Sequence, residues 1–295
     1  MKIVSIGAVL MDQIALVERF PGEDDEVFIP RMQLMPGGSA ANFAVFCSRL
    51  GAETGFVGRV GNDGVGDQLI IDLQREHVNT DTASQSALPT GTAFIGVRPD
   101  GQRMIFAYSG AANDLRESNI DLDYLNGFDH LHLADLKNIS ALKYAAEKFD
   151  GTVSLNPGAL IAERRDDAFD LIKHVDILIC SEAEAKSISG EQTVDECLRA
   201  GADLGPKIVV ITRGPEYPKA FDGKNILTAP THDIKVVDAT GAGDSFSSGF
   251  ITEYLGTGDI YKSLRFAIAV SEIVIQHDGA RGGLKDRAQV QATIQ

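Results

Sequence analysis

Several features are scarce in this sequence. Tryptophan is absent, and only three cysteines occur, Cys47, Cys180 and Cys197. Their odd number and wide spacing argue against a disulfide framework and against a zinc knuckle. We expect all three to be buried as small hydrophobic side chains.

Positive charge and long apolar runs are scarce as well. The chain has 27 basic and 42 acidic residues, which gives a net charge of −15, and no basic run is longer than Arg164-Arg165. Such a chain repels nucleic acid and anionic membrane surfaces. No apolar stretch approaches the ~20 residues that a membrane-spanning helix requires. We therefore expect a cytoplasmic protein that binds neither nucleic acid nor membranes.

The chain does contain a regular alternation of short β-branched runs and longer amphipathic stretches. This alternation is typical of a parallel sheet covered by helices on both faces. We predict strands over residues 2–8, 54–60, 130–134, 152–155, 177–180 and 207–212, and helices over 40–50, 65–77, 140–149, 194–202, 242–255 and 260–276. The expected fold is α/β, with a mostly parallel central sheet in one main domain, residues 1–295.

Two segments interrupt the alternation, approximately residues 13–34 and 92–109, and each resembles a pair of strands. The second contains the sequence RPDGQR, a hairpin turn between two apolar runs. Because both segments are inserted between βα units, we expect them to form a small β-sheet lid over the carboxyl ends of the main strands, where ligands bind in open α/β sheets. The exposed edges and apolar face of such a lid also favour a homodimer.

Two histidines, His130 and His132, fall on one face of a predicted strand. Two imidazoles without a nearby third ligand are a weak metal signal. We expect instead a strand edge near a cleft.

The stretch DATGAGDSFSSGF, residues 238–250, places glycines and an acid directly before a helical pattern, and we expect the run at 234–238 that leads into it to be a strand. Unpaired N–H groups at such a helix start, together with the helix dipole, form an anion site. The stretch is neither a P-loop nor a dinucleotide fingerprint, because GxxxxGK[ST] is missing and Phe246 stands where the third glycine would be. Ordinary helix capping would explain it equally well.

A second glycine turn, MPGGSAANFAVFCSRLGA at residues 35–52, also leads into a helix. Together the two stretches resemble the two signatures of the ribokinase family of carbohydrate kinases, also called the phosphofructokinase-B family. Shorter matches extend the resemblance over nearly the whole chain: GAVLMD, GRVGNDGVGDQL, GAANDL, NPG, SEAE and ITRG. The resemblance implies a three-layer αβα fold and an ATP-dependent kinase that phosphorylates a sugar hydroxyl.

The resemblance assigns catalysis to the turn that begins the later helix. Asp244 would be the general base that accepts the proton of the substrate hydroxyl, and the N–H groups of Gly241, Ala242, Gly243 and Asp244 would form the anion hole for the transferring phosphate. From the helix dipole we expect a low pKa for Asp244. A loose transition state needs little early deprotonation, so its position matters more than its basicity.

The resemblance places the substrate at the first glycine turn and around it. Asp12, expected at the end of the first strand, would accept hydrogen bonds from two adjacent hydroxyls. The other implied contacts are Gly37, Gly38, Ser39, Asn42 and Asn113. Ribokinase itself has a lysine where this chain has Ser39, so a plain ribokinase is not expected.

The substrate class stays open between a sugar or sugar-like alcohol and a nucleoside. Arg31, Arg98 and Arg103 in the lid could hold a phosphate or a carboxylate on the substrate, or could simply be solvated. The lid aromatic side chains could stack on a nucleoside base, or could belong to a half-buried sheet; they are Phe28, Phe94, Phe106 and Tyr108.

For the nucleotide, the resemblance implies ATP with Mg²⁺, bound by Ser181, Glu184, Thr212, Gly214, Gly241 and Gly243. Glu184 would hold Mg²⁺ through water, although Ser181 replaces the asparagine of the family motif. Asp238 and Thr240, with the backbone at Gly279 and Ala280, resemble loops that hold a monovalent cation such as K⁺ in several relatives.

Two rival classes remain. One is a non-catalytic ligand-binding relative, given the changes at Ser39 and Ser181. The other is a nicotinamide dehydrogenase, which shares the sheet but not the glycine spacing.

Overall fold

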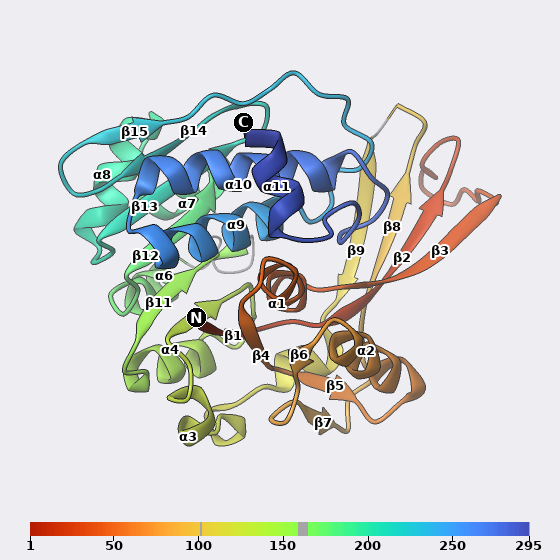
Figure 1. Ribbon diagram of the computed structural model, residues 1–295. Coiled ribbons are helices and arrows are strands. Elements are labelled where there is room, and N and C mark those ends of the chain that lie inside the picture. Colours follow the sequence, from red (N-terminus) through yellow and green to blue (C-terminus); the bar gives the residue numbers. More distant parts are fainter. Residues whose placement is uncertain (101, 159–164, 295) are drawn as a thin grey trace.

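The computed structural model describes residues 1–100, 102–158 and 165–294, and Figure 1 shows its arrangement. Gly101 of the predicted hairpin turn lies outside these residues. The strands form a large sheet, a small sheet and a two-stranded pair, and helices cover the large sheet on both faces. No helix in the described ranges is both long and apolar enough to cross a membrane.

The large sheet has nine strands in the order β15-β14-β13-β12-β11-β10-β1-β4-β6. All of its pairs are parallel except those that β14 makes with β13 and β15. Its strands are β1 Lys2–Ile6, β4 Glu53–Val57, β6 Val78–Asn79, β10 His130–Leu133, β11 Thr152–Leu155, β12 Ile177–Ser181, β13 Ile208–Arg213, β14 Glu216–Phe221 and β15 Ile226–Thr228.

Alternating side chains along these strands separate two cores. Val4 of β1 packs on the face covered by α4, α6, α7 and α8, whereas Ile3 packs on the face covered by α1, α9 and α10. The helices are α1 Ser39–Arg49, α2 Gly64–Arg75, α3 Leu122–Leu125, α4 Ile139–Lys148, α6 Arg165–Ile172, α7 Glu182–Ser189, α8 Val194–Asp203, α9 Ala242–Thr257, α10 Ile260–Ile275 and α11 Arg287–Ile294, with 3₁₀ helices η1 Gly110–Asp114 and η2 Glu117–Asn119. The predicted three-layer α/β fold is confirmed.

The small sheet consists of β2 Leu10–Leu16, β3 Arg31–Gly37, β8 Gly91–Val97 and β9 Arg103–Tyr108, in the order β3-β2-β8-β9. It projects from one end of the molecule, as Figure 1 shows. Both predicted strand pairs are present in it. A separate pair, β5 Arg59–Gly61 and β7 Ser84–Ser86, lies beside α2.

The register of the small sheet separates its residues into two faces. Asp12 lies opposite Met35 on β3 and Ala93 on β8, and the next row contains Gln13, Leu34 and Phe94. Because neighbouring residues on a strand point to opposite faces, Asp12 and Phe94 project to different sides of the small sheet.

Several predictions about local structure need correction. Asp12 is the third residue of β2 in the small sheet and does not end the first strand, because β1 stops at Ile6. The predicted strand at 54–60 divides into β4 and β5, which belong to different sheets. Residues 234–238, expected as a strand before the glycine turn, form none, and Val237 N instead donates to Ile275 O at the end of α10.

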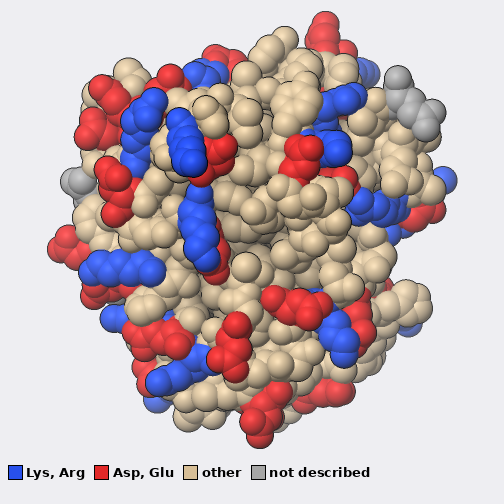
Figure 2. All heavy atoms as spheres, turned by 60° about the vertical axis from the view of Figure 1, so that its left-hand side comes forward, with Lys and Arg blue, Asp and Glu red and all other residues tan. Residues whose placement is uncertain are grey.

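The buried histidines and cysteines lie in the interior. β10 is a central strand, so His130 and His132 are not at a strand edge, and both imidazoles hydrogen-bond Ser154 Oγ, at 2.7 and 2.8 Å. Burial lowers the pKa of both, that of His130 to about 3. The three cysteines are buried, as expected. On the described part of the face in Figure 2, basic and acidic side chains lie interspersed.

Candidate active site

The N-terminus of α9 is built for close approach to other groups. Gly241 precedes the helix at φ 78°, and a Cβ there would overlap the carbonyl oxygen of Ala280. Only glycine combines that backbone conformation with that contact. Among the atoms that the structure describes, a Cβ on Gly243 would meet nothing nearer than Asn156 Nδ2 at 3.9 Å. Ala242 N donates to Ala239 O over 3.3 Å, but the N–H groups of Gly243 and Asp244 have no acceptor within the helix, so this turn can bind an anion.

Asp244, in the same turn, is held by the first turn of α1. Asn42 Nδ2 donates to Asp244 Oδ2 over 2.8 Å, and the nearby hydroxyl of Ser39 also lowers the pKa of this carboxylate. The two glycine turns found in the sequence therefore meet, although 202 residues separate Asn42 from Asp244. Gly38, with φ 98°, caps α1 where a Cβ would collide with the backbone at Ala8.

Burial decides the ionisation of Asp244. Desolvation raises its pKa to about 6, against the opposing hydrogen bond from Asn42 and the charge of Arg281. The expected low pKa is therefore wrong, because loss of water outweighs the helix dipole at this position. At neutral pH the carboxylate is still mostly ionised, and a pKa near 6 suits a general base.

Asp12 faces the same region from the small sheet. It is 6% exposed, its carboxylate makes no hydrogen bond to another described residue, and Gly37 lies against that carboxylate. Burial raises its pKa to about 6, and the charges of Asp244 and Asp238 add to this effect while that of Arg281 opposes it. Asp12 is thus a buried acid whose oxygens are left for a ligand.

Besides Gly241 and Gly243 at the start of α9, the predicted nucleotide residues lie at or just after the carboxyl ends of β12 and β13, which pair at Ser181 and Thr212. Ser181 and Glu184 form a capping box at the start of α7: Ser181 N donates to Glu184 Oε2 over 2.8 Å, and Ser181 Oγ accepts from Glu184 N. Gly214 follows β13 at φ 59°, and a methyl group added there would meet no described atom within 4 Å. Ser181 therefore performs the capping that an asparagine could also perform.

The predicted cation loop is bonded internally. Asp238 Oδ1 accepts from Thr240 N and Oγ1 at 2.9 and 2.7 Å, and Oδ2 accepts from Gly279 N at 3.0 Å. Arg103 of β9 donates to Thr240 Oγ1 over 2.9 Å and lies 3.9 Å from Asp238 Oδ1. With both carboxylate oxygens bonded and a guanidinium beside them, this loop is a poor fit for a monovalent cation.

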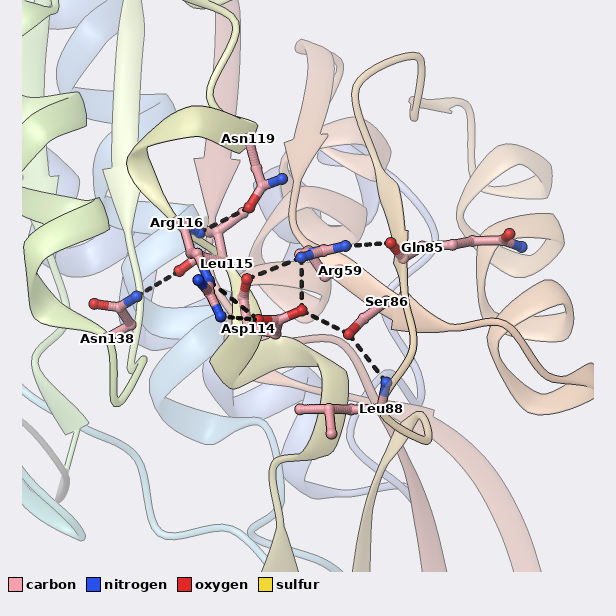
Figure 3. A network of polar contacts seen from close by, with 9 residues as sticks. All are labelled: Arg59, Gln85, Ser86, Leu88, Asp114, Leu115, Arg116, Asn119 and Asn138. Atoms are coloured by element: carbon pink, nitrogen blue, oxygen red, sulfur yellow. Dashed lines mark hydrogen bonds and ion pairs between the residues drawn. The ribbon is translucent and has the colours of Figure 1, made fainter.

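Asn113 lies in η1, which a separate polar network holds in place (Figure 3). Asp114 accepts hydrogen bonds from Arg59 of β5 and from Ser86 of β7, both at 2.7 Å, and Arg116 also contacts it. The network fixes η1 against the β5–β7 pair. Asn113 Oδ1 accepts from Lys137 N over 3.3 Å, which ties η1 to the loop after β10.

Sequence reasoning does not identify Arg281. This side chain is 9% exposed, donates to Asn42 Oδ1 over 2.8 Å and pairs with Asp72 of α2. The nearest signal in the sequence is the neighbouring Gly279-Ala280 pair, and spacing alone cannot show which side chains meet there.

Comparisons with known proteins agree with this geometry. The pfkB family carbohydrate kinase model matches residues 1–287. A ribokinase from Bacillus subtilis is 30% identical over 304 residues, covering 99% of each chain. The ribokinase structure from Thermotoga maritima superposes with a TM-score of 0.90 at 26% identity and 98% coverage of both chains. That of Arabidopsis thaliana ribokinase, complexed with ribose and ATP, gives 0.86 at 27% identity, with 99% and 98% covered. The chain is therefore a phosphotransferase with an alcohol group as acceptor, and it belongs to the pfkB family of carbohydrate kinases.

Proposed function

We propose that this protein transfers the γ-phosphate of ATP to a hydroxyl of a sugar or sugar-like alcohol. The observation that carries the proposal is a pair of carboxylates beside the open N-terminus of α9: Asp12, which is buried, and Asp244, which is half-buried and has a raised pKa. Asp12 has no protein partner among the described residues and can accept hydrogen bonds from substrate hydroxyls. A ribokinase relative of known structure was complexed with ribose and ATP, which supports the assignment of both ligands.

Asp244 is the proposed general base. Asn42 donates to Oδ2 of its carboxylate, so that the other oxygen can face the acceptor hydroxyl and take its proton. The N–H groups of Gly243 and Asp244 would stabilise the charge on the transferring phosphoryl group, at a few kcal/mol per donor, whereas Ala242 N donates to Ala239 O over 3.3 Å. Gly241 allows the turn to pack directly against Ala280.

Mg²⁺ would accompany the nucleotide. Magnesium in kinases is usually bound by one or two carboxylates, by water and by substrate phosphates. Glu184 fits this pattern, because one carboxylate oxygen caps α7 and the carboxylate has a second oxygen with which to hold a water ligand of the ion. When bound, the ion would neutralise charge on the phosphates. The loop with Asp238 and Thr240 is a poor fit for K⁺, so we propose no K⁺ site there.

The orientation of the lid aromatics favours a sugar over a nucleoside. Phe94 and Phe106 pair across β8 and β9 in the row that also contains Gln13, one residue away from the row of Asp12. Tyr108 is in register with Thr92, on the same face as Phe94. These rings project away from Asp12 and cannot stack on a base held there. Phe28, 85% exposed, lies in the loop before β3.

The outward face of the small sheet supports a homodimer. Phe106, Leu34 and Met32 are each more than half exposed on this face, and Tyr108 is 51% exposed. A contiguous apolar surface of this kind is typical of an interface. We propose that two small sheets pack against each other, and sedimentation of the wild type beside Phe106→Lys tests this.

The decisive experiment is ADP release with Mg²⁺ across pentoses, hexoses, keto-deoxy sugar acids, phosphosugars and nucleosides. We expect turnover of a sugar or sugar-like alcohol and a loss of about 10²–10⁴ in rate for Asp244→Asn. Asp259→Asn is the matched control, since Asp259 caps α10 away from the site and asparagine also caps. Absence of turnover with the whole panel would favour a non-catalytic ligand-binding protein. Preferred turnover of nucleosides would favour a nucleoside kinase.

A further inference from the structure

A second row of polar side chains lies behind Asp244 and takes no part in the chemistry above. Arg281 Nε donates to Asn42 Oδ1 over 2.8 Å, and its Nη1 donates to Asp72 Oδ2 over 2.5 Å. Since Asn42 Nδ2 donates in turn to Asp244, a continuous chain of bonds leads from Asp72 on α2 to the proposed base on α9.

This chain determines which way the amide of Asn42 points. An arginine can only donate hydrogen bonds, so it requires the oxygen end of the amide to face it. The nitrogen end must then face Asp244, where it donates to the carboxylate. Asn42 is 4% exposed, so water does not compete for either end. With the amide reversed, its oxygen would face the Asp244 carboxylate and a donor–acceptor contact would be lost on both sides.

The backbone of Arg281 is fixed independently of its side chain. Arg49 Nη1 donates to the carbonyl oxygens of Arg281 and Leu284 at 2.6 and 3.0 Å, while its other nitrogens bind Glu76 at 2.9 and 2.6 Å. Removing the Arg281 side chain therefore leaves the loop anchored. This makes substitution a usable probe.

Charged groups from several elements act on Asp244. Arg281 lowers its pKa and Glu184 of α7 raises it, while Asn42 and Ser39 of α1 lower it by hydrogen bonding. Asp12 of β2 faces the same space, and Asp72 and Glu76 surround Arg281. Arg281 is the cation of this set that acts on both Asp12 and Asp244.

We propose that Arg281 is a positioning residue for phosphoryl transfer, which locks the Asn42 amide so that its N–H orients the carboxylate of Asp244. This inference depends on the proposed function for its kinetic consequence and on geometry alone for its effect on Asp244. Arg281 itself need not touch the substrate.

The test compares wild type with Arg281→Gln and Arg281→Lys in pH–rate profiles of kcat and kcat/KM. For Arg281→Gln we expect kcat to fall about 10–100-fold, since misplacing a reacting group costs that much. We expect the acid limb of the pH–rate profile to shift to higher pH by about one unit, because a cation near Asp244 is lost. Arg281→Lys keeps the charge but cannot bridge Asn42 and Asp72, so it should lower kcat without moving the limb.

A double-mutant cycle and a titration complete the experiment. In an Asn42→Ala background, Arg281→Gln should cause little additional loss of kcat, because it acts through Asn42. Carbon-13 NMR of labelled aspartate, with Asp244→Asn for assignment, should show a higher pKa for Asp244 in Arg281→Gln. This titration tests the role of Arg281 even if no acceptor is turned over. A lack of turnover would count against the proposed function and not against the role of Arg281.

Arg287→Gln is the matched control, because Arg287 pairs with Glu253 near the other end of α9. It should change neither the profile nor the titration. Wild-type kcat with an unmoved pKa in folded Arg281→Gln, or a full additional loss in the Asn42→Ala background, would overturn the inference. If Arg281→Gln does not fold, Arg281→Lys decides by its kcat.

Discussion

Arg103 on the small sheet donates a hydrogen bond to Thr240 Oγ1, immediately before the glycine turn that begins α9. The two residues are 137 positions apart. The bond is the point at which the small sheet reaches the loop that precedes the proposed anion hole. The guanidinium also lies near Asp238, whose carboxylate organises that loop.

Arg103→Gln should therefore weaken catalysis more than stability. We expect kcat/KM to fall about tenfold, the equivalent of one charged hydrogen bond, with a change in unfolding free energy below about 1 kcal/mol because the pair is partly exposed. Steady-state kinetics and chemical denaturation measure the two effects. Arg98→Gln is the control from the same hairpin, since Arg98 bonds Asp100 and Gln102 within the hairpin itself. Equal losses in both variants would contradict a specific role for Arg103.

Two glycines of the α9 turn should respond differently to alanine. Gly241→Ala places a methyl group against the Ala280 carbonyl at a positive φ, so we expect a loss of stability of about 1–3 kcal/mol. The methyl group of Gly243→Ala has room among the described residues and would instead obstruct the phosphate. We expect near-normal stability with a large fall in kcat/KM for ATP.

Thermal unfolding together with ADP-release kinetics separates these two outcomes. The prediction is wrong if Gly243→Ala binds and uses ATP as the wild type does, or if Gly241→Ala unfolds at the wild-type temperature.

Asp12→Asn should stabilise the protein in a pH-dependent way. Burial raises the pKa of Asp12 from its usual 3.8 to about 6. The ionised form therefore destabilises the fold at pH values above both of these pKa values. The difference corresponds to at most about 3 kcal/mol, at 1.4 kcal/mol per pH unit. The gain from Asp12→Asn should be full above pH 6 and should vanish as the pH falls through 6 to below 4.

Urea denaturation of both proteins from pH 4 to pH 8 measures this difference. The buried histidines also make stability depend on pH, but His130 and His132 are unchanged between the two proteins and cancel. Activity should fall sharply in Asp12→Asn although the fold is more stable. A stability difference that grows toward acid pH would refute the sign of the effect.

Much of the architecture can be predicted from sequence because its signals are local. The helices at 39–49 and 242–257 begin within one residue of their predicted starts, since glycine turns and apolar periodicity mark them directly. Asp244 stands out in the sequence for the same reason. The residues around 234–238 have β-branched side chains but form no strand, because strand formation needs a pairing partner far away in the chain.

The features that sequence reasoning misses depend on long-range contacts and on burial. Nothing in the spacing shows that Arg281 reaches Asn42, 239 residues away. Sequence alone predicts the wrong direction for the pKa of Asp244, because the helix dipole is visible in the sequence whereas desolvation is not. For the same reason the central position of His130 and His132 emerges only once the strand order is known.

Asp12 and Asp244 stand on two different parts of the fold, the small sheet and α9, so the distance between them depends on how those parts are placed. Any outward swing of the small sheet would carry Asp12 and Arg103 away together from α9. ATP bound in such an open arrangement would meet water without an aligned acceptor and with a disturbed cradle. If the proposed function holds, the division of the site between the small sheet and α9 would guard against wasteful nucleotide hydrolysis.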